Sequence, residues 1–159
     1  GAQVAEFEPP QGYARLFDEH GKIMSFETAR ALAWEHQHHA GQLSDSLRPR
    51  VEEGWALSRR EYDTARLLAR DCRRALADRM RDFDLLMTPG AAGEAPATLA
   101  TTGTSVFNRV WTLLGVPCVT LPFGSGPSGL PLGVQLVGAY DADSELLGWS
   151  RWAAGVLAG

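Results

Sequence analysis

Three glycines have the spacing of a nucleotide-binding loop. Gly124, Gly126 and Gly129 match the pattern G-x-G-x-x-G. In a dinucleotide-binding loop the third glycine opens a helix whose N-terminus faces the pyrophosphate. Here Leu130 and Pro131 lead instead into an apolar run with the character of a strand. A hairpin turn is therefore the favoured interpretation.

The tract His36-Gln37-His38-His39 contains residues that bind metals. On a helix, Glu35 and His39 lie four residues apart and share a face, as a pair of ligands could. His38 points elsewhere, and no distant pair of cysteines supplies further ligands. A polar surface is therefore favoured over a metal site.

Candidate nucleophiles and bases are few. Ser105 lacks the second glycine of the G-x-S-x-G pattern and follows no strand, so a helix cap is favoured. Cys118 lies in an apolar run, where thiols usually pack without reacting. Lys22 is the single lysine, so a mechanism that needs a lysine base has one candidate. These patterns alone do not define a catalytic centre.

The elements that would position such residues begin with helices. A helix capped by Ser25 is predicted to run to about Ala40 and to stop at Gly41. A shorter helix over 44–53 is predicted to end at Gly54 in a left-handed conformation.

The strongest helix signal begins at Ser58, which forms with Glu61 the S-x-x-E pattern of a capping box. Apolar residues then recur every three or four positions on one face of a long helix: Tyr62, Ala65, Ala69, Cys72, Leu76, Met80 and Phe83. The opposite face carries arginines, for which a solvated surface is favoured over a binding surface: Arg66, Arg70, Arg73, Arg74 and Arg81.

From residue 84 onward, strands alternate with helices. The strands are predicted near 84–88, 117–122 and 132–138. A short Gly/Pro/Ser turn joins the last two as a hairpin. The loop from Gly90 to Gly103 has a length that is usually functional or mobile, and a helix over Val106–Leu114 follows it.

A last helix, capped by Asp141 or Asp143, is predicted to place four apolar residues on one stripe: Leu146, Trp149, Ala153 and Leu157. The chain is therefore expected to be a single piece, 1–159, of the α/β class. Residues 1–83 would be mainly helical and residues 84–159 α/β.

Composition excludes several classes of function. The 159 residues carry a net charge of −4, so there is no basic surface that would predict nucleic-acid binding. No uncharged stretch is long and apolar enough for a spanning helix, so no membrane partner is expected. Two widely separated cysteines, Cys72 and Cys118, favour free thiols in a reducing, cytoplasmic environment, and a disulfide between them is the less favoured alternative.

A series of runs in the second half resembles the C-terminal part of the amidase signature family. These runs are Asp84–Pro89, Ala95-Pro96, Phe107–Pro117, Leu121-Pro122 and Gly129–Gly138. The run G-L-P-x-G-x-Q-x-x-G, together with the upstream W-x-L-x-G-x-P, is specific. Two earlier runs, Met24–Glu27 and Leu57–Tyr62, are similar to the family's helical lead-in. The resemblance implies an α/β/α fold around a mixed sheet.

The resemblance also implies hydrolysis of carboxylic amides. Such enzymes use a serine nucleophile, a bridging serine in a cis peptide and a lysine base, and they form an acyl-enzyme. No metal or organic cofactor is expected. The family's Gly/Ser-rich signature lies upstream of the matched part and has no counterpart here, and the surroundings of Lys22 do not match the family lysine. No catalytic residue and no metal ligand is therefore assigned.

The resemblance assigns the acyl side of a substrate pocket to the loop after Pro89 and to the helix that follows. The implied substrate-binding residues are Thr88, Pro89, Phe107, Asn108 and Trp111. The spacing alone favours a plainer interpretation of Phe107 and Trp111, as the buried face of their helix.

The favoured hypothesis is a C-terminal fragment of an amidase that supplies scaffold and part of the pocket for a small-molecule amide and is inactive alone. The alternative is a stand-alone, non-catalytic domain that binds a small molecule or a partner. A complete enzyme using Cys118 or Ser105 is the least favoured. Strands taken from a larger sheet leave open edges, so self-association of the fragment is expected.

Overall fold

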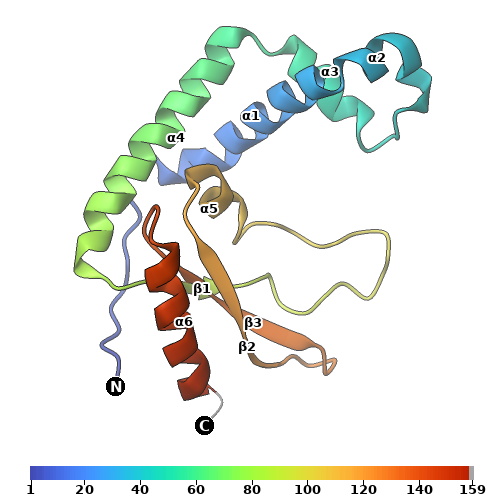
Figure 1. Ribbon diagram of the computed structural model, residues 1–159. Coiled ribbons are helices and arrows are strands. Elements are labelled where there is room, and N and C mark those ends of the chain that lie inside the picture. Colours follow the sequence, from blue (N-terminus) through green and yellow to red (C-terminus); the bar gives the residue numbers. More distant parts are fainter. Residues whose placement is uncertain (158–159) are drawn as a thin grey trace. The chain divides into compact units, whose positions relative to one another are not determined.

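The chain forms two compact units in the computed structural model, which describes residues 1–157 (Figure 1). The helical unit spans Gln11–Cys72, and the sheet unit combines Gly1–Pro10 with the chain from Arg73 onward. The α/β class, with helices first and strands afterwards, is confirmed.

The first half of the chain is helical. Its elements are η1 (Tyr13–Arg15), α1 (Leu16–Ala31), α2 (Ala33–His39), η2 (Ala40–Gln42), α3 (Arg48–Ala56) and α4 (Arg59–Arg79). Of the helices within residues 1–157, none combines the length and the apolar character needed to cross a membrane.

Helices α1 and α3 pack closely at Gly54. A Cβ atom built on Gly54 would overlap the Ser25 carbonyl oxygen and lie 2.7 Å from the Ala29 Cβ, so only glycine allows this approach. Polar bonds hold the crossing from both sides. The Ser25 hydroxyl donates to Glu53 Oε2 at 2.7 Å, and Arg30 Nη1 donates to the Gly54 carbonyl at 2.6 Å.

The predicted helix start at Ser25 was wrong. Ser25 lies buried in the middle of α1. Its hydroxyl donates to Glu53 of α3, so it does not cap a backbone N–H group at a helix start. The predicted single helix to Ala40 is interrupted at Leu32, which separates α1 from α2. Gly54 was also predicted wrongly, since it lies inside α3 and is required for packing rather than for a left-handed turn.

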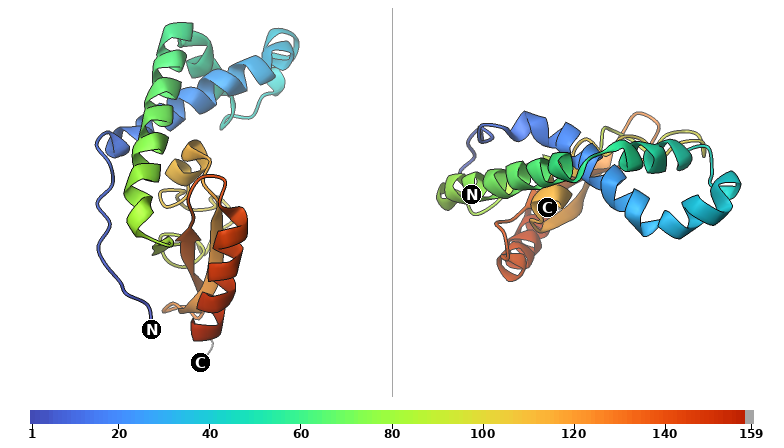
Figure 2. Two further views of the ribbon diagram at one scale, coloured as in Figure 1. Left: turned by 60° about the vertical axis from the view of Figure 1, so that its left-hand side comes forward. Right: turned by 90° about the horizontal axis from the view of Figure 1, so that it is seen from above.

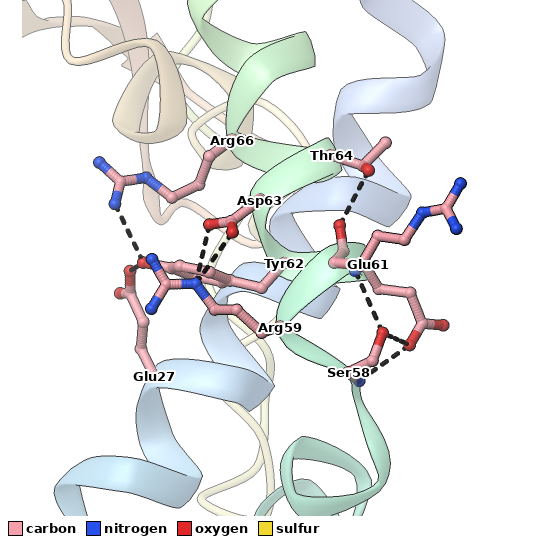
Figure 3. A network of polar contacts seen from close by, with 9 residues as sticks. Glu27, Ser58, Arg59, Glu61, Tyr62, Asp63, Thr64 and Arg66 are labelled. Carbon is pink, nitrogen blue, oxygen red and sulfur yellow. Dashed lines mark hydrogen bonds and ion pairs between the residues drawn. The ribbon is translucent and has the colours of Figure 1, made fainter.

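The capping box of α4 is confirmed. Glu61 Oε2 accepts from the Ser58 N–H at 2.8 Å, and the Glu61 N–H donates to Ser58 Oγ at 3.2 Å (Figure 3). These bonds hold the pKa of Glu61 below its usual value. On the buried face, the Tyr62 ring stacks on Phe26 with centroids 4.3 Å apart, and its hydroxyl donates to Glu27 at 2.7 Å. The apolar stripe is buried from Tyr62 to Met80, as its spacing predicted.

The sheet unit contains three antiparallel strands in the order β1-β3-β2. They are β1 (Leu86–Pro89), β2 (Cys118–Ser125) and β3 (Pro131–Val137). The predicted hairpin is confirmed as β2 and β3. The central strand places Gln135 opposite Thr88 on one side and Thr120 on the other.

Three helical segments complete the sheet unit: η3 (Met80–Asp82), α5 (Arg109–Leu114) and α6 (Asp143–Leu157). Gly115 ends α5 with φ of 65°, which confirms the predicted stop. Figures 1 and 2 show α6 lying along β2 and β3. Its predicted stripe is only partly correct, because Leu146 and Ser150 are buried whereas Trp149 and Leu157 are exposed.

Replacing Gly54 with alanine tests the close contact between α1 and α3. Gly54→Ala places a methyl group against backbone, so we expect the free energy of unfolding to fall by at least about 2 kcal/mol. Gly148→Ala is the matched control, because a Cβ there meets nothing within 4 Å. In that exposed helical position alanine should stabilise by about 0.5–1 kcal/mol. Urea unfolding followed by circular dichroism measures both, and equal effects would contradict the proposed contact.

Candidate functional site

The predicted substrate-binding residues all lie in the sheet unit, near the ends of the loop that joins β1 to α5. Thr88 and Pro89 end β1, Phe107 and Asn108 lie in the turn before α5, and Trp111 lies in α5. Their assignment to a substrate stays a prediction, and the geometry shows which of them are connected.

Asn108 connects the start of the loop to the centre of the sheet. Its Nδ2 donates to the Gly90 carbonyl at 3.1 Å, and its Oδ1 accepts from Gln135 Nε2 at 3.0 Å. The Gly90 carbonyl can only accept, so it requires the Nδ2 group of Asn108 to face it. Asn108 Oδ1 must then face Gln135, which in turn directs Nε2 towards it.

Gln135 was missed by sequence reasoning. It is only 1% exposed, although it lies in the central strand among apolar residues. Its Nε2 also approaches the Phe107 carbonyl at 3.4 Å, and within residues 1–157 its Oε1 lacks a hydrogen-bond partner. A buried amide must be hydrogen-bonded to be tolerated. In the sequence, a glutamine inside an apolar strand was the signal that could have predicted a buried polar contact.

The remaining predicted residues differ in exposure. Thr88 is half-buried and its hydroxyl donates to the neighbouring Pro89 carbonyl at 3.3 Å. Phe107 is half-buried as well. Trp111 is 7% exposed and shares the buried side of α5 with Val110 and Leu114. This burial agrees with the plainer interpretation of the spacing, and a substrate contact by Trp111 stays a prediction.

The loop after β1 is fastened at a second point by Glu94, which sequence reasoning also missed. Its carboxylate accepts backbone N–H bonds from Ser128 and Leu130 in the β2–β3 turn, at 2.9–3.1 Å. Partial desolvation alone would raise the pKa of Glu94, but these bonds outweigh it and lower the pKa. Glu94 is the single charged residue between Asp84 and Arg109, which was the available signal.

The other chemical candidates have structural roles. Lys22 pairs with Glu19 at 3.1 Å on α1. The Ser105 carbonyl, not its hydroxyl, accepts the Asn108 and Arg109 N–H groups before α5. Cys118 lies exposed on β2 and not packed inside, contrary to expectation. Partial desolvation of its sulfur nevertheless raises the pKa to about 11, so the thiol stays protonated at neutral pH.

Two rings of the histidine tract pack against Trp34. The His38 and His39 rings lie 5.2 Å and 4.8 Å from the Trp34 ring, and His38 Nδ1 lies 2.9 Å from the Trp34 carbonyl. Across the described residues 1–157, no group of three His, Cys, Asp or Glu side chains could hold a metal ion.

Arg73 departs from the predicted solvated face of α4. Its Nε donates to the Leu114 carbonyl, one of the acceptors left free where α5 ends. Its guanidinium lies 4.7 Å from the centroid of the Tyr140 ring. Arg73 therefore stabilises the C-terminus of α5.

Comparison with known proteins identifies this architecture. The family model described as Amidase matches residues 3–147. The chain belongs to the amidase family. A solved amidase covers 97% of this chain with a TM-score of 0.82 and 27% identity, and this chain spans 38% of it. Solved 6-aminohexanoate cyclic dimer hydrolase, at 18% identity and a TM-score of 0.68, shares the fold.

Curated relatives are also much longer than this chain. One subunit of the glutamyl-tRNA(Gln) amidotransferase of Neisseria gonorrhoeae is 36% identical over 104 residues, which is 59% of this chain and 22% of the relative. The 2-amino-5-chloromuconic acid deaminase of Comamonas testosteroni is 29% identical over 161 residues, covering 93% of this chain and 34% of the relative. Family membership confirms the resemblance read from the sequence.

Replacing Asn108 tests the connection between the loop and the sheet. Asn108→Ala leaves the buried Gln135 Nε2 without its short hydrogen bond, so we expect a loss of about 1–3 kcal/mol in the free energy of unfolding. Thr112→Ala is the control, because the exposed Thr112 hydroxyl only donates to a carbonyl one turn back in α5, and its effect should stay within about 0.5 kcal/mol. Denaturant unfolding compares the two variants, and indistinguishable stabilities would rule out a structural role for the Asn108 side chain.

Proposed function

We propose that this chain is the C-terminal part of an amidohydrolase that cleaves carboxylic amide C–N bonds. Family membership over residues 3–147 carries the proposal. Because the chain spans only 22–38% of the relatives described above, the larger share of such an enzyme has no counterpart here. The serine nucleophile and its lysine base would lie in that larger share, and this chain would be inactive alone.

In the complete enzyme, this chain would supply scaffold and one wall of the pocket. The proposed wall consists of Thr88, Pro89, Phe107, Asn108 and Trp111, at the two ends of the loop between β1 and α5. The Gln135–Asn108–Gly90 hydrogen bonds support this proposal, because they hold those two ends together on the sheet. Because these residues are already held in place, they lose little conformational entropy when a small amide binds.

In the chemistry proposed for the complete enzyme, the serine oxygen attacks the amide carbonyl and the C–N bond breaks with release of the amine, and water then cleaves the resulting ester to the carboxylic acid and the free serine. A cytoplasmic setting is proposed as well, and it agrees with two unpaired cysteines in residues 1–157. The proposed ligand is a small-molecule amide.

Assays of two matched chains test the proposed activity. The purified 159-residue chain should release no ammonia from a panel of primary amides. A longer chain from the same reading frame, carrying the Gly/Ser-rich signature upstream of Gly1, should hydrolyse at least one of them. Alanine at the signature's nucleophilic serine should abolish that activity. Hydrolysis by the 159-residue chain, or an inactive longer chain, would contradict the proposal.

We also propose that the 159-residue chain associates with itself through α6. Trp149, Trp152 and Val156 recur at helical spacing on the exposed side of this helix, and Val156 is 60% exposed. Exposed apolar surface of this kind favours association. Sedimentation velocity at rising concentration should show oligomers, and Trp152→Glu should reduce them while Ser144→Glu on the same helix should not. A monomer at all concentrations would contradict self-association.

A further inference from the structure

The carboxylate of Glu94 occupies a site built from the backbone of the β2–β3 turn. Oε1 accepts from the N–H groups of Ser128 at 2.9 Å and Leu130 at 3.0 Å, and Oε2 lies 3.1 Å from the Ser128 nitrogen. The turn is itself closed by Gly126, whose N–H donates to the Leu130 carbonyl at 2.9 Å. Charge-assisted bonds of this type are stronger than bonds between neutral groups.

Gly126 provides the space that the Glu94 side chain occupies. A Cβ atom on Gly126 would overlap Glu94 Cγ and lie 2.5 Å from Oε1. Gly126 is absent from the glycines with positive φ, so its backbone conformation does not itself require glycine. Glycine is therefore needed at position 126 because a larger residue would overlap the Glu94 side chain.

Charged residues are scarce in the sequence around Glu94. Residues 110–140 contain no Asp, Glu, Lys or Arg, and Glu94 is the single charged residue of residues 85–108. The backbone N–H groups of Ser128 and Leu130 donate hydrogen bonds to the carboxylate. Further along, the loop forms local hydrogen bonds, from the Ala100 N–H to Thr98 and from the Gly103 N–H to Thr101.

We propose that Glu94 is a positioning residue, which fastens the loop between β1 and α5 to the β2–β3 turn and so preforms the substrate wall. The connection divides a long loop into two shorter spans, one from Gly90 to Glu94 and one from Glu94 to Asn108. Shorter spans have less conformational entropy to lose when a ligand orders them. The effect on substrate rests on the proposed amidase function, whereas the attachment of the loop does not.

Hydrogen exchange on the 159-residue chain tests the attachment directly. In Glu94→Ala, the Ser128 and Leu130 N–H groups, followed in a peptide covering 126–130, should exchange at least about fivefold faster, because both lose their acceptor. Thr102→Ala, an exposed change in the same loop, should leave these rates unchanged. Peptides from α1 should be unaffected in both variants. Exchange at the wild-type rate in the Glu94→Ala variant would overturn the proposal.

A double-mutant cycle separates this contact from general loop damage. Gly126→Ala should displace the Glu94 side chain and accelerate exchange at 126–130 in the wild-type background. In the Glu94→Ala background the same change should add nothing, because the clashing side chain is gone. An equal effect in both backgrounds would show that the two residues do not act together and would overturn the proposal.

The complete enzyme tests the consequence for substrate. With benzamide as probe, Glu94→Ala should raise KM about tenfold and change kcat less than about twofold, since the ordering cost is met on binding. Glu94→Gln keeps one acceptor oxygen and should recover part of the loss. A fall in kcat at unchanged KM would overturn the positioning role. If the complete enzyme hydrolyses no amide, the proposed function fails, and the exchange experiments still decide the attachment of the loop.

Discussion

The sheet unit depends on a buried amide in its central strand. Gln135 is buried beside apolar neighbours, and a buried amide without partners would destabilise the fold. Asn108 satisfies its Nε2, and the Gly90 carbonyl in turn fixes Asn108. This chain of two hydrogen bonds holds the end of β1 and the start of α5 at one place on the sheet. The long loop between them is therefore fixed at both ends, although its own sequence is rich in Gly, Ala, Pro and Thr.

The loop and the hairpin turn stabilise each other by a different kind of bond. Glu94 is a charged group that accepts from backbone donors, whereas Gln135 and Asn108 are neutral amides that are hydrogen-bonded to each other. The turn that matched a nucleotide-binding pattern does bind an anion through backbone N–H groups, and that anion is a side chain of the same chain. Of the three glycines in the pattern, Gly126 makes room for the Glu94 side chain, and the donors are the N–H groups of Ser128 and Leu130.

Local signals were predictable from the sequence, and contacts between distant segments were not. The capping box at Ser58, the hairpin and the end of α5 at Gly115 follow from short-range preferences, and the structure has them. Ser25 was misread as a cap because its partner, Glu53, lies far away in the sequence. Gln135 and Glu94 were missed for the same reason, since their partners are on other elements. The stripe of α6 was only partly correct, because the sheet buries Leu146 and Ser150 and leaves Trp149 exposed.

Arg73 contacts the end of α5, so the boundary between the helical unit and the sheet unit lies inside helix α4. The strand pattern begins near Asp84, which makes that residue the natural place to cut the chain from sequence alone. A chain shortened there would lose the donor at the Leu114 carbonyl and the cation beside Tyr140. It would also lose Phe7, whose ring packs edge-on against Phe83 at 5.6 Å. The sheet unit is thus discontinuous in sequence, and excising it intact requires both the first ten residues and the last turns of α4.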